Sequence, residues 1–115
     1  MVREFRHFIA DILEAIAIVE KAVDGKSFTD YQSDAFLRLG IERAIEIISE
    51  ASRRIPEERL AARPEIPWPK IRGIGNVLRH EYHGLSDKII WGIVFDELPR
   101  LHIAMQAIRD AAEKP

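Results

Sequence analysis

Apolar residues recur every three or four positions along the first part of the chain. The repeat consists of Phe5, Phe8 or Ile9, Ile12, Ile16, Val19 and Val23. Since an α-helix has about 3.6 residues per turn, this spacing puts these residues on one face and predicts an amphipathic helix of about twenty residues. The sequence Asp24-Gly25-Lys26-Ser27 is typical of a turn, so we expect the helix to end there.

A second apolar stripe predicts a second helix that runs to about Ile55. The stripe consists of Leu37, Ile41, Ala44, Ile48, Ala51 and Ile55. Upstream of it, Thr29-Asp30-Tyr31-Gln32 has the form of a capping box, in which the threonine and glutamine side chains satisfy free backbone N–H groups at a helix start. We therefore expect the second helix to begin beside Thr29.

Prolines at positions 56, 64, 67 and 69 interrupt regular structure after the second helix. Residues 57–62 leave room for one short helix within this connection. The connection carries Ile66 and Trp68, which are too apolar for a free linker. We expect Trp68 to pack as an anchor beside the next helix, and a binding role is the less favoured alternative.

Two more helices complete the pattern. A third helix-like stretch begins at Pro69 and reaches Gly84, and Ser86 or Asp87 can cap a fourth. The fourth helix is traced by Ile90, Val94, Leu101, Met105, Ile108 and Ala112. Pro99 removes a helical hydrogen bond, which predicts a kink or break near residues 95–98. With no alternating strand pattern, the sequence predicts an all-α bundle of four main helices, with a possible short helix added.

Length and composition indicate one domain, which we expect to span residues 1–115. The absence of cysteine excludes disulfides and thiolate chemistry. Apolar runs are too short to span a bilayer and the first residues lack a signal-peptide core, so we expect a cytoplasmic protein without a membrane partner. The net charge of −2 gives no general attraction to RNA, so any nucleic-acid contact must come from a local patch.

The densest chemistry lies in Arg79-His80-Glu81-Tyr82-His83-Gly84, at the end of the third helix-like stretch. On an ideal helix one arc of about 100° contains five basic or amide residues and no carboxylate. These are Arg72, Asn76, Arg79, His80 and His83. Arginine binds phosphate oxygens bidentately and histidine can transfer protons near neutral pH, so this face suits a phosphate-bearing ligand. The alternative is an ordinary solvated helix face without a function.

Other motifs are less specific. His80 and His83 are one turn apart and could share a metal, but no second pair of ligands is evident, so we expect no metal and no cofactor. Gly73-Ile74-Gly75-Asn76 follows no strand and lacks the lysine and third glycine of phosphate-binding loops. We expect these glycines to let two helices approach closely instead.

The order of several short motifs resembles the HepT-like toxins of the HEPN superfamily, over nearly the whole chain. The connection supplies Ile66-Pro67-Trp68, and the third helix-like stretch supplies Ile71-Arg72-Gly73-Ile74, Asn76 and His80-Glu81-Tyr82. Supporting pieces are the segment from Asp11 to Ile16, Ser49-Glu50-Ala51 where the family often has Gly-Glu-Ala, and Leu98-Pro99-Arg100-Leu101. The resemblance implies a HEPN-like helical bundle.

The resemblance also implies a function. HepT-like proteins are toxins of type II toxin-antitoxin systems and resemble metal-independent endoribonucleases, with a composite active site where the two subunits of a homodimer meet. Their motif is an arginine, four to six residues, then His-x-Tyr. His80 and Tyr82 match it, and His80 would move protons during RNA cleavage. The motif arginine is missing because Gly75, Ile74 and Gly73 occupy the three possible positions.

Several residues take roles in this interpretation. Arg72 or Arg79 must take the catalytic role of the missing motif arginine. The candidates for RNA binding are Asn76, His83 and Lys70. The resemblance further implies a nucleotidyltransferase antitoxin that transfers AMP to Tyr82. The alternative, which we weigh equally, is that Tyr82 is structural and that its ring completes the helix packing.

A second class of function stays open at this point. Because Gly75 replaces the motif arginine, the chain could be a catalytically degenerate HEPN-like module that binds nucleotide or protein without cleavage.

Overall fold

The computed structural model describes residues 5–80 and 86–113, and within these ranges the secondary structure is helical with no strand. The helices are α1 (Arg6–Val23), α2 (Phe28–Ser33), α3 (Ala35–Ser52), α4 (Glu57–Ala61), α5 (Trp68–His80), α6 (Asp87–Gly92) and α7 (Leu98–Glu113), with a π-helix, η1 (Ile93–Glu97), between the last two. The prediction of an all-α bundle is confirmed. No helix in the described ranges is long and apolar enough to cross a bilayer.

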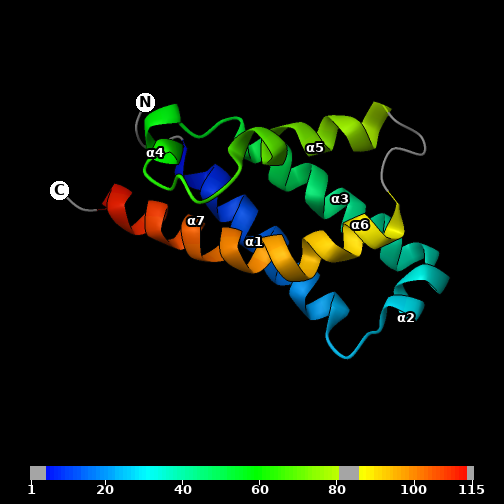
Figure 1. Ribbon diagram of the computed structural model, residues 1–115. Coiled ribbons are helices and arrows are strands. Elements are labelled where there is room, and N and C mark those ends of the chain that lie inside the picture. The colour runs from blue at the N-terminus through cyan, green and yellow to red at the C-terminus, as the bar shows by residue number, and fades with distance from the viewer. Residues whose placement is uncertain (1–4, 81–85, 114–115) are drawn as a thin grey trace.

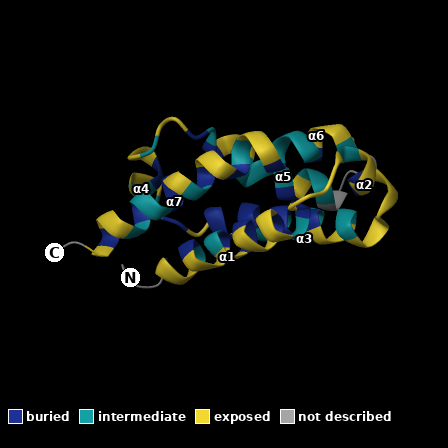
Figure 2. Cartoon of the chain, turned by 90° about the horizontal axis from the view of Figure 1, so that it is seen from below, coloured by how far each residue is buried: buried dark blue, intermediate teal, exposed yellow. Residues whose placement is uncertain are grey.

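Three helix pairs form the body of the bundle: α1 packs on α3, α3 packs on α5, and α1 packs on α7 (Figure 1). Each long helix turns its buried stripe inward and its polar side outward (Figure 2). The stripes predicted from spacing are the ones that form the core, including Ile9, Ile12 and Ile16 of α1 and Ile41 and Ile48 of α3. Burial of this apolar surface provides the main stabilisation of the bundle.

The second predicted helix is in fact two helices, so this prediction was wrong in its details. Ser27, and not Thr29, starts α2: its hydroxyl accepts a hydrogen bond from the Asp30 N–H, and the Asp30 carboxylate accepts one from the Ser27 N–H. The chain then breaks at Asp34, whose backbone is extended and whose carboxylate accepts from the Leu37 N–H to begin α3. The apolar stripe does not reveal this break because it starts at Leu37, after Asp34.

The connection between α3 and α5 has the form predicted from its prolines. The short helix α4 lies within it, and Trp68 is buried at the start of α5. The indole Nε1–H donates to the carbonyl oxygens of Leu60 at 2.8 Å and Arg63 at 3.1 Å. Trp68 is therefore the packing anchor expected for it, and it fixes the first turn of α5 against α4.

Pro99 is accommodated by a change of helix type, which confirms the expected disturbance before it. Proline has no N–H, and its ring conflicts with the carbonyl four residues earlier. The preceding residues 93–97 form the wider π-helix η1, in which the Leu98 N–H donates to the Ile93 carbonyl. Such π-helical turns are a common source of local helix distortion. Ser86 caps α6 by accepting from the Ile89 N–H.

Gly75 lies at a tight contact between α5 and α3. Its N–H donates to Ser49 Oγ at 3.1 Å, and a Cβ built on Gly75 would lie 2.8 Å from that oxygen and 2.9 Å from the Ser49 Cβ. Both distances are shorter than real Cβ contacts, so only glycine fits here without movement. The expected close approach of two helices is confirmed for Gly75. Gly73 is different, because a Cβ there would meet nothing within 4 Å.

Gly75→Ala is therefore expected to destabilise the protein, although alanine normally favours a helix. Forcing a methyl group against Ser49 should lower the free energy of unfolding by about 1–3 kcal/mol, as in other overpacked sites. Chemical denaturation followed by circular dichroism measures this change.

Gly73→Ala is the matched control, two residues away in the same helix. Because its Cβ has open space, it should raise the free energy of unfolding by about 0.5–1 kcal/mol, the usual helix-propensity gain. A Gly75→Ala variant as stable as Gly73→Ala would show that the α3–α5 contact is not tight.

Candidate functional site

The helix α5 holds three of the predicted site residues within its described part: Lys70, Arg72 and Asn76. Arg72 and Asn76 are four residues apart, so they share one side of the helix. Asn76 is exposed and Arg72 is half-buried. The structure therefore brings these two together, next to the contact between α5 and α3.

The Arg72 side chain points away from α3 and pairs with α4. Its Nη1 lies 2.9 Å from Glu57 Oε2, while the exposed fractions of the two side chains are 29% and 72%. An ion pair with so exposed a carboxylate contributes at most about 1 kcal/mol. The Arg72 guanidinium is thus held at the surface by a weak contact with α4.

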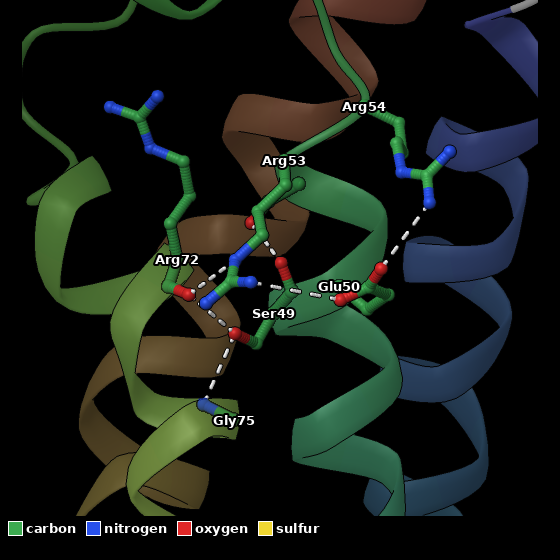
Figure 3. A network of polar contacts seen from close by, with 7 residues as sticks. Ser49, Glu50, Arg53, Arg54, Arg72 and Gly75 are labelled. Carbon is green, nitrogen blue, oxygen red and sulfur yellow. Dashed lines mark hydrogen bonds and ion pairs between the residues drawn. The ribbon is translucent and has the colours of Figure 1, made fainter.

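On its other side, the Arg72 backbone is held by α3 and by Arg53, the residue that follows α3 (Figure 3). The Arg72 carbonyl oxygen accepts one hydrogen bond from Ser49 Oγ at 2.9 Å and a second from Arg53 Nε at 3.0 Å. Ser49 also accepts from the Gly75 N–H, so its hydroxyl bridges two backbone groups of α5. The Ser49 main chain is itself tied to Ser52, whose hydroxyl donates to the Ser49 carbonyl at 2.7 Å.

Lys70 lies elsewhere on α5. On an ideal helix it is about 160° from Arg72, and it lines an apolar groove of about 370 Å³ between α5, α6, η1 and α7. The remaining lining residues include Ile74, Val77, Ile93, Glu97 and Leu101. The structure thus separates Lys70 from the pair Arg72 and Asn76, and places it beside an apolar surface instead.

The other predicted site residues fall partly or wholly outside the description. Arg79 and His80 belong to the last turn of α5, and their side chains are outside the described part. Tyr82 and His83 lie outside the described residues. Positions 72, 76 and 80 of α5 are spaced four residues apart. Residues at this spacing lie on one side of a helix, so the three positions form one row along α5.

Arg53 contributes to this face and is not evident from the sequence. It follows α3 directly, and its side chain crosses to α5 (Figure 3). The contact depends on how close α3 and α5 lie, which no local pattern encodes. The one available signal is its four-residue spacing from Ser49, which would put the two on one side of a helix.

The arrangement provides cationic and amide groups on one side of a helix that has no carboxylate of its own between Trp68 and His80. Guanidinium groups suit planar, bidentate contacts with phosphate oxygens. The carboxylates near this face, Glu57 and Glu50, come from other elements and are exposed. The face is therefore suited to a polyanion, while the protein as a whole carries a charge of −2.

Comparison with known proteins gives a consistent picture. The family described as "Ribonuclease HepT-like" matches residues 12–108. The "Probable ribonuclease HepT" of Thermococcus cleftensis is 32% identical over 109 residues, which cover 95% of this chain and 99% of that protein. The "Putative RNase TTE0752" of Caldanaerobacter subterraneus subsp. tengcongensis is 33% identical, over 90% of this chain and 92% of that protein.

No solved structure matches the chain significantly. The family match covers most of the sequence, including α3 and α5 with the contact between them. Two relatives above 30% identity extend over nearly their full lengths. The resemblance found in the motifs is thereby confirmed, and the chain belongs to the HepT-like ribonuclease family.

Proposed function

We propose that this protein is the toxin of a type II toxin-antitoxin system and that it cleaves RNA as an endoribonuclease. One observation carries the proposal: in a chain of the HepT-like ribonuclease family, α5 runs without a break from Trp68 to His80. The unbroken helix keeps Arg72, Asn76 and His80 in one row. Basic and imidazole groups in such a row suit a sequence of phosphates.

The chemistry uses a nucleophile that RNA itself contains. The 2′-hydroxyl of a ribose attacks the phosphorus of its own 3′-phosphate, and the bond from phosphorus to the 5′-oxygen of the next nucleotide breaks. One product ends in a 2′,3′-cyclic phosphate and the other begins with a 5′-hydroxyl. The 2′-hydroxyl loses a proton and the leaving oxygen gains one, and His80 is the group we assign to this transfer. No metal-bound water is needed as the nucleophile.

An arginine is needed where negative charge accumulates on the phosphate. Arg72 and Arg79 are the two candidates on α5. About 12 Å along the helix axis separates residues 72 and 80, and helical side chains lean toward the N-terminus, away from His80 in the case of Arg72. Arg72 of one copy can therefore reach a phosphate bound at His80 of a second copy more easily than a phosphate bound at His80 of the same copy.

The apolar groove supports such a second copy. It lies on the side of α5 that carries Gly73 and Val77, next to the polar row, and Ile89 beside it is 52% exposed. Of the apolar residues Ile90, Ile93 and Val94 that run from α6 into η1, Ile90 and Val94 are buried in the core of the subunit, whereas Ile93 lines the groove. A homodimer through the groove would cover its apolar surface and bring two copies of α5 together.

Tyr82 is the residue we propose for control by a nucleotidyltransferase antitoxin. The chain has two tyrosines, and the other, Tyr31 of α2, is fully buried beside Trp91 of α6. Burial raises the pKa of the Tyr31 hydroxyl above its ordinary value, with the carboxylates of Asp87 and Glu42 adding to the shift. Tyr31 is therefore inaccessible and neutral. An AMP group on Tyr82 would add negative charge near the proposed RNA site.

One observation favours the alternative, a degenerate module that binds without cleavage. Position 75 is packed against Ser49 so tightly that it has no room for an arginine side chain. The family's usual arginine is thus replaced by a residue that the α3–α5 contact requires. The tests of cleavage below separate the two functions.

The wild-type protein is expected to cut single-stranded RNA in the presence of EDTA. His80→Ala should lower the cleavage rate by about 10²-fold or more, because it removes the proton-transferring group. Arg72→Ala and Arg79→Ala test which arginine contacts the scissile phosphate. The variant that removes this contact should lower the cleavage rate by a similar factor. Gel analysis of a labelled RNA measures the rates.

Two controls accompany this experiment. His7→Ala removes an exposed histidine of α1 and should leave the rate unchanged. An RNA with 2′-deoxyribose at the cleaved position should resist cleavage, because it lacks the nucleophile. Wild-type protein that binds RNA but never cuts it would establish the degenerate module, and His80→Ala cutting at the wild-type rate would refute the assignment of His80.

The protein is expected to sediment as a dimer at micromolar concentration. Val77→Glu, which introduces a charge into the groove, should shift it to monomer and abolish cleavage together. Ile18→Glu on α1, which alters an exposed isoleucine away from the groove, is the control and should stay dimeric. A wild-type protein that cleaves RNA as a monomer would exclude the composite site.

Incubation with the cognate nucleotidyltransferase and ATP is expected to add one or more AMP units, visible by intact mass spectrometry. Tyr82→Phe should prevent the addition while losing only a hydroxyl group. If Tyr82→Phe gains the same mass as wild type, the modified residue is a different one, and peptide mapping would locate it.

A further inference from the structure

We propose that Arg53 binds a phosphate of the RNA chain beside the polar row of α5, so that the binding surface includes the end of α3 as well as α5. This inference rests on the proposed RNA-cleaving function, and it adds a residue outside α5 to the site. It gives Arg53 a role in binding the RNA, distinct from the proton transfer at His80.

The Arg53 guanidinium is fixed in place by the backbone of α5. Its Nε–H donates to the Arg72 carbonyl at 3.0 Å, which uses one edge of the planar group. Nη1 and Nη2 carry the remaining four N–H donors. Their nearest acidic neighbour in the described part of the chain is Glu50 Oε2, 4.0 Å from Nη1 and beyond hydrogen-bonding distance. With 40% of the side chain exposed, the donors are accessible to an oxyanion.

The positive charge of Arg53 is only weakly compensated. Its hydrogen-bond partner is a neutral carbonyl oxygen, and its ion pair with the Glu50 carboxylate is long, at 4.0 Å. Arg72 pairs with the Glu57 carboxylate at 2.9 Å, and Arg54 pairs with the Glu50 carboxylate at 3.5 Å. Arg54 also lies 5.9 Å from the centre of the Phe8 ring, on the side of α1. Figure 3 shows the two consecutive arginines pointing in different directions, with Arg53 toward α5 and Arg54 away from it.

The close helix contact explains why Arg53 reaches α5. Gly75 allows α3 and α5 to approach, and Ser49 and Arg53 then donate to the same carbonyl oxygen. The guanidinium groups of Arg53 and Arg72 lie on different sides of the Arg72 backbone (Figure 3). Two guanidinium groups placed in this way contact different phosphates, so Arg53 extends the binding surface along the RNA strand.

The test is a titration of the full-length protein with a fluorescein-labelled 2′-O-methyl RNA, which has no free 2′-hydroxyl and is not cleaved. Binding is measured by anisotropy over a series of salt concentrations. For a single strand, each phosphate contact contributes about 0.7 to the slope of log affinity against log salt. Arg53→Gln is expected to reduce the slope by about that amount and to weaken binding about tenfold at low salt.

Arg54→Gln is the matched control, since it removes the same charge from the next residue. Its slope and affinity should stay within experimental error of wild type. Arg53→Lys retains the charge and should keep most of the slope. If Arg53 only supports α5 structurally, Arg53→Lys and Arg53→Gln will weaken binding alike and leave the slope unchanged, which would overturn the proposal.

Cleavage assays with ordinary RNA separate this inference from the proposed function. Arg53→Gln should raise KM about tenfold and leave kcat within about twofold, because the residue contacts the strand away from the scissile phosphate. If wild type cleaves RNA and Arg53→Gln has the same KM and the same salt slope, the role of Arg53 is refuted and the proposed function stands. A wild-type protein that neither binds nor cleaves RNA would refute both.

Discussion

The contact between Ser49 and Gly75 is the constraint on which the candidate site depends. One hydroxyl accepts from the Gly75 N–H and donates to the Arg72 carbonyl, and the missing Cβ of Gly75 allows the distance to be this short. Burying a hydroxyl group is costly unless its hydrogen bonds are made, so these two hydrogen bonds of Ser49 fix the register of α5 on α3. Every polar residue of α5 takes its position from that register, as does Arg53 after α3.

Charge is distributed so that this face is basic while the protein is acidic overall. The carboxylates beside it belong to α3 and α4, and they are mostly exposed, so they orient the arginines without burying their charge. Exposed pairs of this kind are weak and sensitive to salt. In the proposed function, such a surface would favour a polyanion over a small anion, because a flexible phosphate chain can replace more than one carboxylate at once.

Much of the bundle is predictable from the sequence, and the reasons differ between elements. The helical stripes of α1 and α7 are strong because their apolar residues repeat over several turns, and the prolines correctly located α4 and the distortion before Pro99. The break at Asp34 is a matter of backbone capping, which hydrophobic spacing does not detect. At the site, α5 and its polar row were predicted, but Arg53 was not, because its place beside Arg72 arises only when two helices pack.

The tight fit at Gly75 also has an evolutionary consequence. A larger residue at position 75 meets Ser49, so its cost in stability depends on which side chain stands at position 49. The two positions are therefore coupled, and the order in which they change affects the stability of the intermediate. In a lineage that carries serine at position 49 and glycine at position 75, a direct change of position 75 to arginine is more costly than one that follows the loss of the serine side chain.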